Sequence, residues 1–257
     1  MKRKSITVWA LTVALVCLLV TGCKSGCSEI TDDNKTVERT EGQDSVFMNI
    51  DFPQCGNKLL QTAIVEYISE TLGGTYEGDY ADTDSLMAHY ASEYMADMRE
   101  IRSEFLDDVP MEFYREATVN KVYETDKVVT YVFSTEEYSG GAHGIGSVSG
   151  VTFRKSDGRR VGLDMLRECD LSEEVKEGLM EYFEVKTDKE LEENLMGVDA
   201  DLIPMPETRP YFMDGGLVFV YQSYEIACYA AGRPSFTIPY EKLRPMLNVT
   251  GRRLFSE

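Results

Sequence analysis

Apolar and polar residues follow two regular patterns along most of the chain. Alternation predicts half-buried strands, and an apolar residue every three to four positions predicts amphipathic helices. Strand patterns run through residues 45–52, 111–123, 127–134, 147–153, 211–214, 217–221 and 234–239. Helical patterns run through residues 57–72, 85–105, 171–185, 187–196 and 240–247, with a short turn at 163–166. Because short turns join most neighbouring strands, we predict an α+β fold, with helices packed on a mostly antiparallel sheet.

Two polar stretches set the expected limits of the folded domain. Residues 23–44 are rich in charged and hydroxyl side chains and show no apolar period, which predicts a flexible tether. Residues 248–257 are expected to form a tail. The α+β domain is therefore predicted to cover residues 45–247.

The first residues carry an export signal. Lys2, Arg3 and Lys4 are followed by an apolar run and then by small residues up to Cys23. This order is typical of a secretory signal peptide, here residues 1–22. The apolar run is short for a membrane-spanning helix, which needs about 20 residues. The sequence Val-Thr-Gly-Cys resembles the lipobox of bacterial lipoproteins, and the resemblance implies cleavage before Cys23 and lipidation of its thiol.

The residue after that cysteine bears on the destination of the protein. In many Gram-negative lipoproteins an aspartate at this position marks retention in the inner membrane, whereas this chain has Lys24. The resemblance therefore implies a lipid-anchored protein of the outer membrane, on its periplasmic or its outer face.

The charge of the chain limits its partners. The formal net charge is −19 at pH 7. Such an acidic protein repels the phosphates of nucleic acids and anionic lipids, so direct binding to either is not expected. The charge suits a basic partner such as a cationic protein, and solubility alone is an alternative explanation for it.

Four cysteines remain once Cys17 is removed with the signal peptide and Cys23 is lipidated. They are Cys27, Cys55, Cys169 and Cys228. In an oxidising compartment they allow three pairings, and the sequence does not choose among them. There is no Cys-x-x-Cys pair and no zinc-site spacing, so neither a redox role nor a zinc site is expected.

A glycine-rich stretch at residues 137–160 stands between two strand patterns. Its five glycines are Gly140, Gly141, Gly144, Gly146 and Gly150. So many glycines indicate positive φ angles or close approach of the backbone, and predict a shaped loop. His143 lies inside it and could act as an acid, a base or a ligand. The alternative is that its ring hydrogen-bonds to the backbone and holds the loop in place.

Two acidic groups contain residue types that bind metal ions. The first is Asp79, Asp82 and Asp84, which lack the glycine and distal glutamate of a calcium loop. Asp84 is more simply the cap of the helix that follows. The second is His89, Glu93 and Asp97, which are spaced four apart on one helix face. A solvated polar face explains this trio equally well, so we expect no metal and no cofactor.

The glycine loop and several later motifs together resemble a known family. The motifs are Tyr138–His143, Val148–Phe153, Asp157-Gly158, Leu163–Leu166 and Tyr224–Gly232. In this order they resemble the extracytoplasmic domain shared by RsiV-type anti-sigma factors and PdaC-type peptidoglycan deacetylases. The resemblance implies an α+β domain that binds a ligand at the cell surface, which in the best-known branch is lysozyme. The sequence shows neither a sigma-binding segment nor a deacetylase domain, so neither of those activities is expected here.

Two hypotheses of function follow. The first is a non-catalytic, lipid-anchored binding or sensing module that takes lysozyme, a peptidoglycan fragment or another envelope or host ligand. Its candidate ligand-binding residues are His143, Gly140, Gly141, Tyr224 and Tyr229, with Arg233 beside the tyrosines. The second is an envelope hydrolase of glycan or peptide, in which His143 would meet a carboxylate or a serine. We favour the first, because no catalytic motif stands in its required context.

Overall fold

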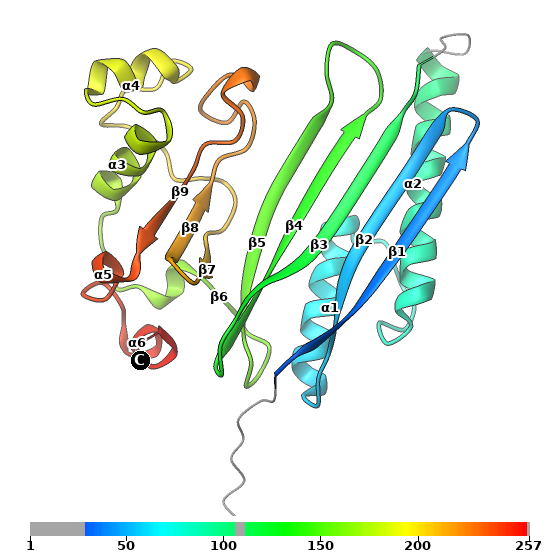
Figure 1. Cartoon of the computed structure of the whole chain (residues 1–257), viewed down its shortest axis with the longest axis horizontal. Coiled ribbons are helices and arrows are strands. Elements are labelled where there is room, and N and C mark those ends of the chain that lie inside the picture. Colours follow the sequence, from blue (N-terminus) through cyan, green and yellow to red (C-terminus); the bar gives the residue numbers. More distant parts are fainter. Residues whose placement is uncertain (1–28, 106–110, 256–257) are drawn as a thin grey trace, which may run out of the picture.

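The chain folds around two separate β-sheets (Figure 1). The computed structural model describes residues 29–105 and 111–255. The predicted signal peptide, Cys23 and Cys27 lie outside these ranges. One sheet has six strands in the order β1-β2-β3-β4-β5-β6, and the other has three in the order β7-β8-β9. With helices packed on both sheets, the predicted α+β class is confirmed. No helix within the described residues is both long and apolar enough to cross a bilayer.

The larger sheet and two long helices make up the N-terminal unit. Its strands are β1 Thr31–Glu41, β2 Asp44–Gln54, β3 Tyr114–Glu124, β4 Val128–Tyr138, β5 Ile145–Arg154 and β6 Arg160–Val161. Its helices are α1 Lys58–Leu72 and α2 Thr83–Phe105. All neighbouring strands are antiparallel except β2 and β3. That pair is parallel because α1 and α2 form the crossover between the two strands.

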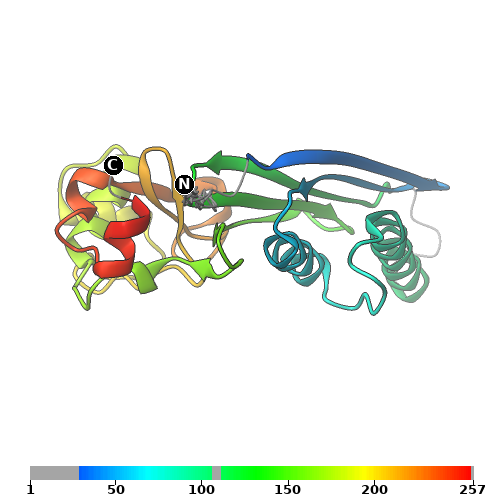
Figure 2. The ribbon, with the colours of Figure 1, turned by 90° about the horizontal axis from the view of Figure 1, so that it is seen from below.

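Helices α1 and α2 cover one face of this sheet, and no helix of the described chain covers the other face (Figure 2). Alternate residues of β2, among them Val46, Met48 and Ile50, point to the helices and are fully buried. Asn57 caps α1 by accepting from the Leu59 and Leu60 amides, as the predicted start at residue 57 implies. The face away from the helices is the open face of the sheet.

The prediction that residues 23–44 are a flexible tether is wrong for β1, which pairs with β2 from end to end. Ile30 anchors the start of the strand: it is buried, and its amide donates to the Glu124 carboxylate at 2.8 Å. Asp32 lies 2.8 Å from the Lys121 ammonium and accepts from the Tyr131 hydroxyl at 3.0 Å. The strand lacks apolar alternation because it is a polar edge strand, a common protection against edge-to-edge pairing.

The smaller sheet and a set of short helices make up the C-terminal unit. Its elements are η1 Leu163–Met165, α3 Ser172–Tyr182, α4 Asp188–Asn194, β7 Tyr211–Met213, β8 Gly216–Val220, η2 Tyr229–Ala231, β9 Ser235–Pro239, α5 Tyr240–Leu243 and α6 Val249–Phe255. Helix α3 packs on β9, and the unit has its own apolar core. A capping box begins α4, with Thr187 and Glu190 capping the helix reciprocally.

Three features of the chain differ from the predictions. The expected tail contains α6, whose first turn is capped by Asn248 and whose Phe255 ring stacks on Phe212 at 3.7 Å. Before α2, Asp82 rather than Asp84 accepts from the Ser85 amide, whereas Asp84 contacts Lys35. At the start of α3, serine is a residue type that predicts an N-cap, but Ser172 is already the first residue of the helix, and the N-cap residue is Leu171, which makes no side-chain capping bond. Short polar segments at the end of an element carry too little periodicity to predict a terminal helix or to decide which residue is the N-cap.

A closed ring of three hydrogen bonds joins the two units. The Phe212 amide of β7 donates to Thr152 at 2.8 Å, and Thr130 donates to the Phe212 carbonyl at 2.7 Å. The two threonine hydroxyls are 2.9 Å apart and both side chains are fully buried. Every donor in this ring, which we call the threonine clamp, has an acceptor. The clamp therefore docks β7 on the open face of β4 and β5 without leaving a buried polar group unpaired.

We predict that Thr152→Val destabilises the protein by about 1–3 kcal/mol, because the buried Phe212 amide loses its acceptor. Equilibrium unfolding in urea measures the change. Thr118→Val is the control, since Thr118 lies half-exposed on the neighbouring strand β3. Equal stability of the two variants would show that the clamp does not hold the units together.

A second prediction concerns Glu124, which accepts from Lys155 at 2.6 Å, from Ile30 and from Lys121 at 3.1 Å. Burial raises the pKa of Glu124, but these hydrogen bonds outweigh it and hold that pKa below its usual range. Because the pKa of Glu124 is lower in the folded state, its ionised carboxylate stabilises the fold at pH values above the unfolded-state pKa of about 4.3. This stabilisation is lost as the pH falls through the lower folded-state pKa.

Glu124→Gln should therefore cost roughly 3 kcal/mol at pH 7, because it leaves the buried Lys155 without its carboxylate. It should also flatten the loss of stability between neutral and acidic pH. Urea unfolding at several pH values tests both effects, with the exposed Glu116→Gln as control. A wild-type acid dependence in Glu124→Gln would contradict the assignment.

Candidate functional site

The glycine loop connects β4 to β5 at the end of their hairpin. Gly140 and Gly141 have φ angles of 105° and 96°, which other residues rarely adopt. The Tyr138 hydroxyl donates to the Gly141 carbonyl at 3.0 Å and closes the loop across its base. A side chain on Gly144 would lie 2.7 Å from the Glu137 carbonyl oxygen. The glycines therefore shape a tight loop that presents His143 at its tip.

His143 meets two tyrosines of the C-terminal unit. Its ring stacks on Tyr229 with centroids 3.8 Å apart and planes 17° apart. Its Nε2 lies 3.1 Å from the Tyr224 hydroxyl, and its Nδ1 lies 2.8 Å from the Gly144 carbonyl. Because a carbonyl only accepts, Nδ1 carries the proton of the neutral ring, and Nε2 accepts from Tyr224. We call these three residues the histidine–tyrosine cluster.

The cluster is exposed to solvent. Tyr224 is 46% exposed and Tyr229 is 37% exposed, and His143 is also exposed. The Tyr182 hydroxyl of α3 donates to the Ala231 carbonyl at 2.7 Å and so fixes η2, which carries Tyr229. The hydrogen bond to η2 and the contacts among the three rings therefore hold the cluster in place, and its side chains remain exposed.

Tyr224 has a strained backbone. Its φ angle is 69°, in the left-handed region that costs a non-glycine residue about 1 kcal/mol or more. The side chain of Glu225 holds the turn, accepting from the Gln222 amide and from the Glu207 amide, both at 2.7 Å. Strain of this kind persists where the surroundings impose it, and such positions concentrate at binding and catalytic sites.

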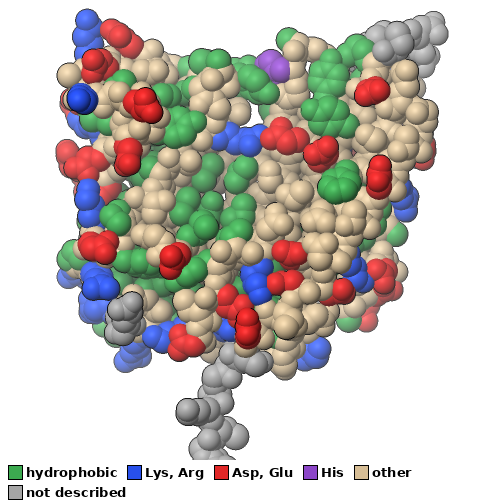
Figure 3. Space-filling view, viewed as in Figure 1, with side chains coloured by type: hydrophobic (Ala, Val, Ile, Leu, Met, Phe, Trp, Pro, Cys, Tyr) green, Lys and Arg blue, Asp and Glu red, His purple; other side chains and the backbone are tan. Residues whose placement is uncertain are grey.

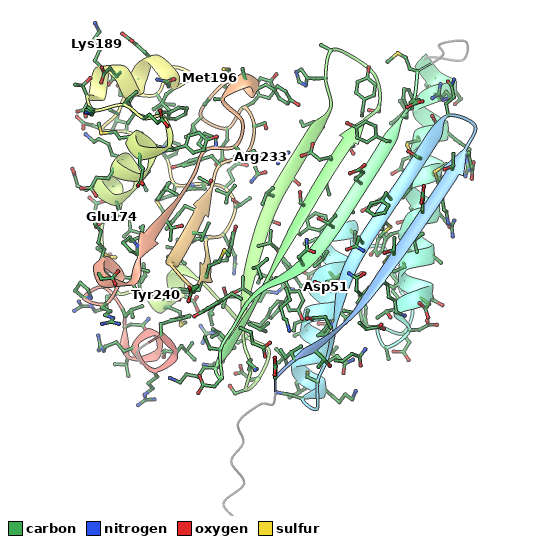
Figure 4. All side chains as sticks on the ribbon, in the orientation of Figure 1. Asp51, Glu174, Lys189, Met196, Arg233 and Tyr240 are labelled. Atoms are coloured by element: carbon green, nitrogen blue, oxygen red, sulfur yellow. The ribbon has the colours of Figure 1, made fainter. Side chains whose placement is uncertain are left out.

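Two polar bridges lie next to the cluster on the same line between the units. Arg233 pairs with Glu136 of β4, and its side chain points from the C-terminal unit toward the β4–β5 hairpin (Figure 4). The side-chain amide of Gln222 bonds to β5 as the backbone of a neighbouring strand would. Its oxygen accepts from the Val148 amide at 3.0 Å, and its nitrogen donates to the Val148 carbonyl at 2.8 Å. A side chain on Gly146 would collide with both Arg233 and Glu136. The glycine thus permits the close approach of the two units.

The structure brings together the residues predicted to bind a ligand, although they lie far apart in the sequence. His143, Tyr224 and Tyr229 are in contact, and Arg233 lies beside them, whereas Gly140 and Gly141 shape the loop and contact neither tyrosine in the described hydrogen-bond network. Sequence reasoning missed Glu136 and Gln222 as bridging residues. The alternation of β4 places Glu136 on the open face, but nothing in the sequence says what lies opposite.

His143 does not have the surroundings that the hydrolase hypothesis expects. Its hydrogen-bond partners among the described residues are a tyrosine hydroxyl and a backbone carbonyl. A nucleophile-and-base pair would place a serine or a carboxylate within about 3 Å of the ring. Among the described residues, the cluster therefore offers a stacking surface and polar groups.

The two acidic groups weighed as metal sites are engaged by side chains and backbone. The Thr75 hydroxyl bridges His89, at 2.9 Å, and Glu93, at 2.5 Å. Asp97 lies 3.6 Å from Arg115. Within the described ranges no group of three His, Cys, Asp or Glu residues could hold a metal ion. Cys169 and Cys228 are exposed thiols and are not joined to each other.

Two family models match separate parts of the chain. Residues 40–146 match the model described as deacetylase PdaC, and residues 167–241 match a protein of unknown function, DUF3298. His143 falls in the first match, and Tyr224 and Tyr229 fall in the second. The cluster therefore forms where the two matched segments meet. No match was found among curated proteins.

Solved structures share the fold. A DUF3298-family protein of Bacteroides fragilis superposes with a TM-score of 0.70 at 22% identity, covering 89% of this chain and 98% of that one. A DUF3298-family protein of Pseudomonas aeruginosa superposes with a TM-score of 0.59 at 16% identity, covering 86% of this chain and 95% of that one. At these identities the likeness concerns the fold.

The family matches and the shared fold agree with the resemblance drawn from the sequence motifs. The match to the PdaC model is consistent with a place in the cell envelope. One segment of this α+β fold thus matches a PdaC model and another a DUF3298 model, which is consistent with an RsiV/PdaC-like domain.

Proposed function

We propose that this protein is a non-catalytic, lipid-anchored binding module of the bacterial envelope, and that the histidine–tyrosine cluster contacts its ligand. The observation that carries the proposal is the set of three exposed rings, contributed by two units and in contact with one another. Exposed aromatic rings held rigidly are typical binding hot spots, since they supply contact area at little cost in side-chain entropy.

The geometry of the chain supports a ligand approaching from the side away from the membrane. Cys23 is eight positions before Thr31, where β1 begins, so the anchor reaches at most about 28 Å. Ile30 contacts Glu124 near the β3–β4 turn, whereas the glycine loop lies at the other end of β4. The start of β1 and the β4–β5 loop are at opposite ends of the sheet in Figure 1. A membrane anchor at Cys23 would leave the cluster pointing outward.

The charge of the protein favours a basic protein as the ligand. Acidic side chains are spread over the face shown in Figure 3, in keeping with the net charge of −19. Glu136 and Glu137, next to the cluster, are partly exposed. A basic partner such as lysozyme would be steered to such a surface at low ionic strength. A peptidoglycan fragment is the second ligand to test, because sugar rings also pack on exposed aromatic side chains.

We predict that the purified protein binds lysozyme, and that His143→Ala and Tyr229→Ala each weaken binding tenfold or more, as expected for central aromatic contacts. Biolayer interferometry with immobilised protein measures this. His143→Ala should lower the free energy of unfolding by only about 1 kcal/mol, because the ring is exposed.

The matched control is Leu59→Ala, which removes a 71% exposed side chain from α1, away from the cluster. It should bind as the wild type does. The proposal fails if neither lysozyme nor peptidoglycan fragments bind, or if the cluster variants bind as well as Leu59→Ala. A large loss of stability in His143→Ala would instead assign that residue a structural role.

The anchor is tested separately. Cells expressing the wild-type protein and fed an alkyne analogue of palmitate should produce labelled protein, and Cys23→Ser should abolish the label. Cys27→Ser is the control and should remain labelled, because the signal-peptide pattern ends at Cys23. An unlabelled wild type, or loss of label in Cys27→Ser alone, would overturn the anchor at Cys23.

A further inference from the structure

A cavity of about 490 Å³ lies where the two units meet, at the end of the sheet remote from the histidine–tyrosine cluster. It is lined by residues of β5, β6 and η1 and of the segment that leads into β7. Its size is in the range of small-molecule sites. None of the residues of the histidine–tyrosine cluster lines it.

Three arginines from two distant segments converge on this cavity. Arg159 and Arg160 come from the β5–β6 connection, and Arg209 comes from the segment before β7. Asp164 is the acidic residue of the lining. A local excess of positive charge is unusual in a chain with 26 basic and 45 acidic residues. It marks the cavity as a place where an anion would be attracted.

The three guanidinium groups differ in their ion pairs. Arg159 pairs with Asp164 at 2.6 Å. Arg160 pairs with Glu70 of α1 at 2.8 Å and lies 4.8 Å from the centre of the Tyr67 ring, which holds it in place. Arg209 makes no ion pair with any described residue. After the two internal pairs, the cavity retains one formal positive charge, that of Arg209.

The rest of the lining is apolar or backbone. Val151 and Val161 are buried and form the floor, and Leu163 is 41% exposed at the rim. Gly162 is pressed against the Pro210 carbonyl, where an added side chain would lie 3.0 Å away. The cavity thus pairs a single uncompensated cation with an apolar floor.

We propose that this cavity binds a small organic monoanion, a carboxylate carried on an apolar body, with the carboxylate on Arg209. One net positive charge matches one carboxylate, and Arg offers two parallel donors to its oxygens. The apolar body would lie over Val151 and Val161. A free organic acid and the C-terminal carboxylate of a peptide share this chemistry, and the experiment below distinguishes them.

Isothermal titration of the full protein with hexanoate and with N-acetylleucine tests the proposal. Each acid is compared with its uncharged amide, and acetate is included as a carboxylate without an apolar body. We expect hexanoate, N-acetylleucine or both to bind, and the amides and acetate to bind at least tenfold more weakly. Preference for N-acetylleucine assigns a peptide terminus, and preference for hexanoate assigns a free acid.

Arg209→Gln should weaken binding of the preferred acid by roughly tenfold. Arg209 is exposed, so the variant should fold, and its unfolding midpoint in urea checks that it does. Lys189→Gln removes one positive charge from the far corner of the C-terminal unit (Figure 4) and should bind as the wild type does. The proposal is overturned if neither acid binds, if acid and amide bind equally, if inorganic phosphate binds more tightly than either acid, or if the two variants behave alike.

Discussion

The threonine clamp is the interaction on which the rest of the structure depends. Thr130 and Thr152 are polar residues in fully buried positions of the large sheet, and they are tolerated there because Phe212 offers one donor and one acceptor in register. Each unit has its own apolar core, so burial alone does not determine how the units sit against each other. The directional hydrogen bonds of the clamp determine this relative placement.

The functional surfaces follow from this docking. Once β7 lies on β4 and β5, Gln222 and Arg233 reach Val148 and Glu136, and the tyrosines near η2 come within reach of the glycine loop. The Arg209 segment, which precedes β7, is brought to the β5–β6 edge by the same docking. The cluster and the arginine-lined cavity therefore lie on one seam and require the same relative placement of the units.

Most of the elements could be predicted from the sequence, because a strand or helix with one buried face repeats its apolar residues at a fixed period. Strand β1 could not be predicted in this way, because residues far away in the sequence hold it in place. Glu124 binds Ile30, and Lys121 and Tyr131 bind Asp32. The parallel β2–β3 pair and the division into two sheets could not be predicted either, because the periodicity of apolar residues carries no information about strand order.

The candidate site, too, could be predicted from the sequence only in part. The glycines and His143 are conspicuous in the sequence, and the resemblance to a family pointed to Tyr224 and Tyr229. Their contact, and the role of Glu136 and Gln222 next to them, depends on pairing across 81 positions of the chain. That pairing is a property of the docked units rather than of any local segment.

Mapping by NMR of the residues that respond to lysozyme tests the histidine–tyrosine cluster most directly as the binding surface. In a titration of isotope-labelled protein, we expect the largest chemical-shift changes at His143, Tyr224 and Tyr229, on both units together. Changes confined to one unit, or centred on helices α1 and α2, would show that the histidine–tyrosine cluster is not the binding surface.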